Sequence, residues 1–317
     1  MTIQWVLVAL YFGLGLFASL FLGPVVIPQL HKLKFGQAIR EEGPQSHLAK
    51  QGTPTMGGFI FITAFLFVMA IFFINDPKVV TVMLSMVLFG AVGFADDYLK
   101  VIRKHNLGLK SKQKILLQLS VSIIMTMMVA QFGLETHLPF GLGDISLGFW
   151  FYPWMLFIFI AVDNAVNLTD GLDGLATSVT FVVMLFYALV AALQGEKFLM
   201  LSALAMAGAL LGYLKFNWYP AKIFMGDTGS LALGGLVAAF AMVLKIPFFI
   251  PIIGFVYVIE NLSVIIQVGL YKKTKKRFFK MAPIHHHFEL SGWHEIRIVL
   301  TFTAVTVVMG IIGLLAL

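Results

Sequence analysis

Long apolar stretches, separated by short polar ones, follow one another along the whole chain. Each stretch has about 17 to 25 residues, the length a helix needs to cross about 30 Å of hydrocarbon. Backbone groups in lipid must bond within their own segment, so the repetition predicts a bundle of membrane-spanning helices. We expect about ten spans in a single polytopic domain (1–317), at 3–29, 56–74, 78–96, 114–133, 151–168, 174–194, 197–215, 229–244, 246–268 and 297–316.

Composition strengthens the membrane assignment. Hydrophobic residues make up 60% of the chain and charged residues 12%, with a mean hydropathy of +0.94, whereas soluble domains are far more polar. The chain has no cysteine, which excludes disulfides and thiolate metal sites. The stretch at 3–29 is too long for a signal peptide and lacks its basic start, so we expect a true span. The predicted class is an all-α integral membrane protein.

Basic residues predict the orientation of the spans. All but three of the 22 Lys and Arg residues fall in connections on one side of the predicted membrane, the exceptions being Lys78, Lys197 and Lys245. Cytoplasmic loops carry such an excess, so this side is expected to be cytoplasmic and both termini to lie outside. The net charge of +7 then reflects membrane insertion and anionic lipid headgroups, and nucleic acid is not expected as a partner.

Carboxylates stand at span ends on this same side. Asp96 and Asp97 close a span in GFADDYLK, Asp170 and Asp173 lie in NAVNLTDGLDGLA, and Asp227 opens a span in FMGDTGS. Acidic groups next to a span are costly and are functional candidates by default. Adjacent carboxylates also repel unless a metal or a lysine offsets their charge. The alternative for Asp96 and Asp97 is an ordinary helix end that reaches water.

The segment NAVNLTDGLDGLA places Asn164, Asn167, Asp170 and Asp173 at every third position. On a helix these side chains would form a slowly turning polar stripe. A capped helix–turn–helix would explain one Asn and one Asp, but not four polar groups at equal spacing. We therefore interpret the segment as part of a polar site.

Two further segments carry candidate chemistry. FMGDTGS opens a helix, whose N-terminus favours an anion such as phosphate, although capping by Asp227 alone is a competing explanation. APIHHHFE holds His285, His286 and His287 in a row. Three consecutive histidines cannot all reach one metal from a helical face, so we expect hydrogen bonds to phosphate or sugar. A plain surface loop is the alternative.

These groups share one membrane face with a basic stretch that contains Lys110, Lys112 and Lys114. Without cysteine, oxygen-rich ligands suit Mg²⁺, with Mn²⁺ as an alternative. Basic groups and a divalent cation together suit a substrate that bears phosphates. The residues therefore indicate metal-dependent phosphoryl transfer on a membrane-embedded substrate.

Five motifs resemble the bacterial phospho-N-acetylmuramoyl-pentapeptide transferase family, and the resemblance runs from the first span to the last. They are GTPTMGG at 52–58, FADDYLK at 94–100, NAVNLTDGLDGLA at 164–176, FMGDTGS at 224–230 and APIHHHFE at 282–289. The resemblance implies a multi-pass enzyme of the bacterial cytoplasmic membrane, usually a homodimer, with its active-site cleft on the cytoplasmic face. It would transfer phospho-MurNAc-pentapeptide from UDP-MurNAc-pentapeptide to the membrane lipid undecaprenyl phosphate, giving lipid I and UMP with Mg²⁺.

The resemblance also implies residue roles. Asp227 would bind Mg²⁺, and Asp96 and Asp97 would serve the attacking lipid phosphate; Lys112 and His286 complete the catalytic set. Lys50 and Asp173 would contact the uracil, Phe224 would stack on it, and Lys112, Asn167 and Asp170 would line the diphosphate region. The substrate-binding candidates are thus Lys50, Asn164, Asn167, Asp170, Asp173, Asn217, Phe224, His285 and His287. Asp163 stands where the family suggests a small residue, and it receives no role.

Three alternatives remain beside this interpretation. A related polyprenyl-phosphate GlcNAc-1-phosphate transferase shares the Asp motifs, and the histidine segment argues against it. A cation transporter would place its carboxylates near the membrane centre, and a structural scaffold gives no account of the acidic span ends. Pro247, Pro251 and Glu260 further predict a bent or interrupted ninth span, and a lipid groove beside it is a hypothesis.

Overall fold

The computed structural model describes residues 2–32, 50, 52–72, 75–103 and 108–317. Three of the expected cytoplasmic basic residues, Lys34, Arg40 and Lys104, lie outside this part of the chain. The helices are α1 (Thr2–Lys32), α2 (Gly58–Ile71), α3 (Pro77–Arg103), α4 (Ser111–Ala130), α5 (Phe151–Thr169), α6 (Leu175–Leu193), α7 (Lys197–Asn217), α8 (Gly226–Val243), α9 (Ile250–Ile253), α10 (Phe255–Thr274), α11 (Ile284–Glu289) and α12 (Glu295–Leu315). Two 3₁₀ turns, η2 (Gly148–Trp150) and η3 (Pro247–Phe249), and two strands, β1 (Glu135–His137) and β2 (Asp144–Ser146), complete the described elements.

Within the described residues, nine helices are long and apolar enough to cross a membrane. The expected span at 56–74 appears as α2, an apolar helix of 14 residues. The expected ninth span is interrupted, as its prolines predicted: η3, α9 and α10 follow one another, and Gly254 between α9 and α10 leaves the helical conformation (φ −97°, ψ 25°). The chain is therefore an all-α, multi-pass membrane protein.

Helix α8 forms the centre of the bundle and is buried along almost its whole length. Its sequence is rich in Gly and Ala. Small residues let helices pack closely in a membrane, where the hydrophobic effect does not drive helices together. A Cβ added at Gly93 of α3 would lie 2.0 Å from the Asp227 carbonyl oxygen, and one at Gly235 would lie 2.4 Å from Phe89. This close packing fixes the first turn of α8 against the last turns of α3.

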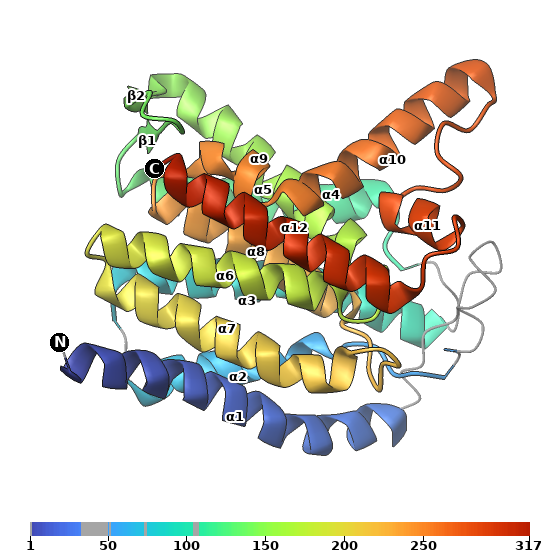
Figure 1. Cartoon of the computed structure of the whole chain (residues 1–317), viewed down its shortest axis with the longest axis horizontal. Coiled ribbons are helices and arrows are strands. Elements are labelled where there is room, and N and C mark those ends of the chain that lie inside the picture. Colours follow the sequence, from blue (N-terminus) through green and yellow to red (C-terminus); the bar gives the residue numbers. More distant parts are fainter. Residues whose placement is uncertain (1, 33–49, 51, 73–74, 104–107) are drawn as a thin grey trace.

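The two ends of the bundle differ (Figure 1). Both termini lie at one end, and the last turns of α10, with α11 and the start of α12, lie at the other. The segment 134–150 forms the β1–β2 hairpin and η2 at the end that carries the termini. The hairpin is tied to the helix ends because His137 N donates to the Lys245 carbonyl at 2.7 Å and Phe140 N to the Ala316 carbonyl at 2.7 Å.

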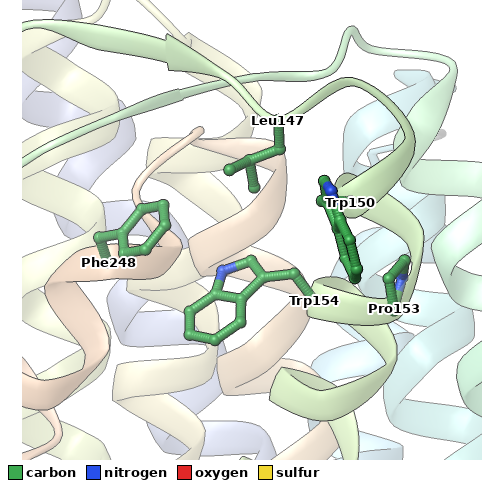
Figure 2. A pocket seen from close by; sticks show the side chains of 5 residues that line it. All are labelled: Leu147, Trp150, Pro153, Trp154 and Phe248. Atoms are coloured by element: carbon green, nitrogen blue, oxygen red, sulfur yellow. The ribbon is translucent and has the colours of Figure 1, made fainter.

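An apolar pocket of about 320 Å³ lies near this hairpin (Figure 2). Its lining is formed by Leu147, Trp150, Pro153, Trp154 and Phe248. Tryptophans at the end of a membrane span are typical of the lipid–water interface. The acidic and histidine motifs lie at the opposite end of the helices, so this pocket is separate from the residues that carry the chemistry.

Candidate active site

Three carboxylates meet where α3 approaches its end and α8 begins. Asp96, Asp97 and Asp227 each place a carboxylate oxygen within 4.8 Å of the other two. Asp96 and Asp97 are only 3% and 2% exposed. Buried carboxylates this close are strongly unfavourable unless positive charge compensates them. The cluster therefore requires cations.

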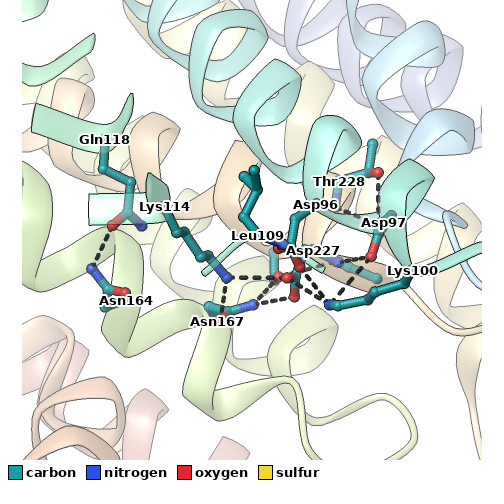
Figure 3. Close-up of polar contacts among 12 residues, drawn as sticks. Asp96, Asp97, Lys100, Leu109, Lys114, Gln118, Asn164, Asn167, Asp227 and Thr228 are labelled. Atoms are coloured by element: carbon teal, nitrogen blue, oxygen red, sulfur yellow. Dashed lines mark hydrogen bonds and ion pairs between the residues drawn. The ribbon is translucent and has the colours of Figure 1, made fainter. Parts of the chain in front are cut away.

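Two lysines supply positive charge in this structure. Lys100 Nζ lies 2.6 Å from Asp96 Oδ2 and 2.9 Å from Asp227 Oδ2, and Lys114 Nζ of α4 lies 3.0 Å from the same Asp227 oxygen. Figure 3 shows the two ammonium groups approaching Asp227 from two sides. Lys100 follows Asp96 by four positions, so one helical turn brings both side chains to the same face. We call these five residues, Asp96, Asp97, Lys100, Lys114 and Asp227, the acidic cluster.

Asp97 is held by the N-terminus of α8. Its Oδ2 accepts hydrogen bonds from the backbone N–H and the hydroxyl of Thr228, both at 2.8 Å, and its Oδ1 accepts from Asp227 N at 3.2 Å. A carboxylate is stabilised at a helix N-terminus by the free N–H groups and the helix dipole. Gly226 begins this turn with φ +73°, a conformation that glycine adopts without strain. Asp97 thus caps α8 from a neighbouring helix.

The polar stripe of the fifth expected span reaches the cluster through one residue. Asn167 Nδ2 donates to Asp227 Oδ1 and to Ser230 Oγ, both at 2.8 Å. Asn164, one turn earlier, donates instead to Gln118 Oε1 at 3.2 Å and to the Ile160 carbonyl at 2.8 Å. The two asparagines therefore have different environments.

Asp170 lies where α5 ends, and Asp173 lies in the turn before α6. Burial raises the pKa of Asp170 well above its usual value, and the negative charges of Asp227, Asp97 and Asp173 raise it further. A carboxyl group with such a pKa binds a proton more strongly than an exposed aspartate does. The folded protein thus favours the protonated, neutral form of Asp170.

Lys50 and Asp173 form an ion pair at this loop. Lys50 Nζ lies 2.8 Å from Asp173 Oδ1 and 2.7 Å from Glu295 Oε1, and it stands over the Tyr219 ring at 5.7 Å from the ring centroid. Asp173 Oδ2 accepts from Ala221 N at 2.9 Å. Burial lowers the pKa of Lys50, but the carboxylates of Glu295 and Asp173 outweigh burial and raise that pKa above its usual value. Lys50 is therefore firmly cationic.

The GTPTMGG and FMGDTGS segments pair through their backbones. Phe224 N donates to the Pro54 carbonyl, and Gly57 N donates to the Phe224 carbonyl, both at 2.8 Å. Asn217, which is buried, accepts from Thr177 Oγ1 at 2.7 Å and donates to the Ile223 carbonyl at 3.0 Å. Asn217 thus stabilises the backbone of the segment that carries Phe224.

The three consecutive histidines face three different partners. His285 is fully buried and its Nδ1 lies 3.0 Å from Glu260 Oε2. His286 Nδ1 lies 2.6 Å from Glu289 Oε2, and His287 Nδ1 accepts from Lys280 N at 3.1 Å. A Cβ added at Gly171 would lie 2.2 Å from His285 Nε2. His285 is thereby packed against the loop that bears Asp170 and Asp173.

Comparison with known proteins adds the family. Residues 79–245 match the model for glycosyl transferase family 4, and residues 50–62 match the phospho-N-acetylmuramoyl-pentapeptide-transferase signature 1. The chain is 51% identical over 309 residues to a phospho-N-acetylmuramoyl-pentapeptide-transferase of Clostridium kluyveri, covering 96% of this chain and 97% of the relative. It is 53% identical over 298 residues to one of Clostridium perfringens, covering 93% and 94%. The chain belongs to the phospho-N-acetylmuramoyl-pentapeptide transferase family.

Membership in this transferase family confirms the resemblance drawn from the five motifs and makes the chain an enzyme. The signature region contains Lys50 and the GTPTMGG segment, and the family-model region contains the whole acidic cluster. Both matched regions therefore contribute to the site described above.

The structure of this transferase also adds residues to the site that the motif analysis did not name as site residues. Lys100 and Lys114 join the acidic cluster, and Glu295 joins Lys50 and Asp173. Lys100 is recognisable from its spacing to Asp96, whereas no local pattern marks Glu295. Lys112 is exposed on α4 and has no hydrogen bond or ion pair among the described residues. The roles implied for Lys112 and for the other candidates remain predictions.

The donor set of the transferase fits a hard divalent cation. Such ions take carboxylate oxygens, and the cluster offers three carboxylates whose oxygens lie within 4.8 Å of one another. Both oxygens of Asp97 are already engaged by the start of α8. Asp227 Oδ2 and Asp96 Oδ2 bond to lysine ammonium groups, which are able to move, so these two oxygens would be the better ligands.

Proposed function

We propose that this transferase moves phospho-MurNAc-pentapeptide from UDP-MurNAc-pentapeptide to undecaprenyl phosphate, giving lipid I and UMP. The observation that carries the proposal is the acidic cluster, in which Asp96 and Asp227 meet two lysines at the end of membrane spans. The names of the relatives point to the same reaction. The enzyme would be a homodimer in the bacterial cytoplasmic membrane, with the acidic cluster on the cytoplasmic face and both termini outside.

The bond changes define what the site must stabilise. An oxygen of undecaprenyl phosphate attacks the β-phosphorus of the UDP group, and the bond from that phosphorus to the bridging oxygen breaks. UMP leaves with the electron pair of the broken bond. Both reactants are anions, so positive charge in a dry site is the main source of rate acceleration. The acceptor phosphate is already largely ionised at neutral pH, which favours direct attack over a covalent enzyme intermediate.

Lys100 and Lys114 are placed to supply that charge. Both ammonium groups contact Asp227, and each has a flexible side chain that can exchange a carboxylate oxygen for a phosphate oxygen. Asp96 and Asp227 would hold Mg²⁺, or alternatively Mn²⁺, which when bound would supply positive charge to the UMP phosphate as it leaves. Asn167 would keep the Asp227 carboxylate in orientation through its 2.8 Å hydrogen bond.

The nucleotide end would lie on the side of Lys50 and Asp173. These residues offer a cation and a carboxylate next to each other, which suits the carbonyl and N–H groups of uracil, and Phe224 would stack on the base. Asp170 would lie near the diphosphate, and His286 with its neighbouring histidines would face the sugar or the phosphates. This arrangement places the donor across the loop between α5 and α6.

UMP release by the purified protein tests the proposal. The detergent-solubilised chain is given undecaprenyl phosphate and Mg²⁺ with either UDP-MurNAc-pentapeptide or UDP-GlcNAc, each with and without EDTA. UMP release from the pentapeptide donor alone, abolished by EDTA, is the expected result. Release from UDP-GlcNAc alone would keep the chemistry but assign the chain to the related GlcNAc-1-phosphate reaction. Folded protein that releases UMP from neither donor would overturn the proposal.

A further inference from the structure

Glu295, the first residue of α12, is buried at the nucleotide end of the site. It is 8% exposed, and its carboxylate lies 2.7 and 2.9 Å from Lys50 Nζ. The same carboxylate accepts a hydrogen bond from the Asp173 backbone N–H at 2.6 Å. Glu295 thus joins two residues that lie 245 and 122 positions away in the sequence.

Helix capping does not account for this placement. An acidic residue in the first turn of a helix is favoured by the helix dipole, but that effect requires neither burial nor a lysine partner. The N-cap of α12 is His294, whose side chain accepts from Ile296 N. Buried ion pairs also contribute little net stability, because desolvation offsets their attraction. A role in arranging Lys50 and Asp173 explains the contacts better.

The charges show what that role is. One ammonium, that of Lys50, lies between two carboxylates. If Asp173 were the only partner of Lys50, the whole charge of the ammonium would act on the Asp173 carboxylate. Asp173 would then be a weak acceptor for any further hydrogen bond. Glu295 shares the Lys50 ammonium, so Asp173 keeps acceptor capacity while its position is fixed by the Ala221 and Lys50 hydrogen bonds. A carboxylate acceptor and an ammonium donor are then held next to each other.

We propose that Glu295 is a positioning residue that sets Lys50 and Asp173 as a donor–acceptor pair selective for a uracil edge. Uracil presents an N–H between two carbonyl oxygens, which matches an acceptor next to a donor. Cytosine has no hydrogen on that ring nitrogen and places an amino group where uracil has a carbonyl. The proposal rests on the proposed function, because it takes the donor nucleotide to be a uridine diphosphate.

Nucleotide binding by the full-length protein in detergent provides the first test. Calorimetric titration with UMP and with CMP measures the preference without requiring turnover. Glu295→Gln keeps the shape of the side chain and removes its charge, so we expect about a tenfold loss of UMP affinity, the size expected for a hydrogen bond to a charged group, and a smaller preference over CMP. Glu196→Gln is the matched control, because it breaks an ion pair with Lys78 at the opposite end of the helices.

A kinetic measurement separates positioning from a general loss of structure. In Glu295→Gln we expect the KM for the UDP donor to rise about tenfold while kcat stays within about twofold and the KM for undecaprenyl phosphate is unchanged, the pattern for lost ground-state binding. Glu295→Asp retains the charge but shortens the reach, and we expect the same direction of change. It serves as the second variant if the glutamine variant does not fold.

The outcomes distinguish this inference from the proposed function. Unaltered protein that binds neither UMP nor the UDP donor would overturn both. Unaltered protein that prefers UMP, with the same preference in Glu295→Gln and Glu295→Asp, would overturn only the role of Glu295. A fall in kcat with the donor KM unchanged would also overturn it, because a residue that arranges the nucleotide end must act on donor binding.

Discussion

The side-chain amide of Asn167 donates a 2.8 Å hydrogen bond to the carboxylate of Asp227 across 60 positions of sequence. The amide oxygen of Asn167 accepts from Lys114 Nζ at 3.3 Å. One side chain therefore contacts both the acid and one of the lysines that neutralise it (Figure 3). Because each oxygen of Asp227 already has a defined donor, its orientation does not depend on substrate.

Replacing Asn167 should lower turnover without unfolding the protein. Asn167→Leu removes the hydrogen bond to Asp227, and a hydrogen bond to a charged group contributes about 1.5–3 kcal/mol, or about ten- to hundredfold in rate. Ser230→Ala is the matched control, since it removes the other acceptor of the Asn167 amide but leaves the bond to Asp227. UMP release measures both variants. Equal activity of the two would contradict the importance of the Asn167–Asp227 bond.

The sequence-based prediction and the structure favour different lysines of α4 as the catalytic one. The family resemblance favours Lys112, whereas Lys114 is the residue that contacts Asp227. We expect Lys114→Met to reduce kcat by about a hundredfold or more, as for other groups that stabilise transition-state charge, and Lys112→Met to have a clearly smaller effect. The reverse order in UMP-release rates would restore Lys112 as the catalytic lysine and make Lys114 a structural partner of Asp227.

Much of the helical architecture could be predicted, because the width of the hydrocarbon layer fixes the length of a span. The ends of the spans were less predictable. The expected span at 78–96 appears as α3, which continues to Arg103. Polar residues there do not end the helix, because Lys100 pairs with Asp227 of α8 and Asp97 accepts a hydrogen bond from the start of α8. For the same reason, α8 begins at Gly226 rather than at 229.

The site was predictable only where chemistry is local in sequence. Adjacent aspartates and a repeating Asn/Asp stripe are visible in the sequence itself. Their motifs predicted that Asp96, Asp97, Asn167 and Asp227 lie in one region. Glu295 has no such signal, since its partners come from other segments of the chain. Contacts of this kind depend on how the helices pack, which a single sequence does not reveal.

The contact between α3 and α8 gives a steric test. A Cβ at Gly93 would lie 2.0 Å from the Asp227 carbonyl oxygen, so Gly93→Ala must push α8 away from Asp97. We expect a loss of about 1–3 kcal/mol of stability, typical of overpacking, together with strongly reduced UMP release. Gly269→Ala is the control, because a Cβ there meets nothing within 4 Å. Thermal unfolding in detergent measures both variants, and equal melting temperatures would contradict the close packing.

The raised pKa of Asp170 predicts a pH-dependent cost to stability. Burial, followed by the charges of Asp227, Asp97 and Asp173, raises this pKa in the folded protein. The folded state then binds the proton more tightly than the unfolded state, so stability is highest at low pH and falls as the pH rises through the folded pKa. Without metal, Asp170→Asn should therefore melt at a higher temperature than the unaltered protein at neutral pH. That difference should shrink as the pH approaches about 4, near the unfolded pKa, and a pH-independent difference would refute this account.

The three aspartates of the acidic cluster should differ in metal binding. Asp227 and Asp96 each have one oxygen, Oδ2, that bonds to mobile ammonium groups, whereas both oxygens of Asp97 are bonded to the start of α8. Titration with Mn²⁺, followed by electron paramagnetic resonance of the free ion, measures the affinity without substrate. We expect Asp227→Asn and Asp96→Asn to weaken binding by about tenfold or more, because each removes a charged oxygen ligand.

Asp97→Asn should instead lower the melting temperature, since it weakens the capping of α8. If Asp97→Asn abolished Mn²⁺ binding in folded protein while Asp96→Asn did not, the ligand pair would be Asp97 and Asp227, and the lipid phosphate would have to be served by Asp96.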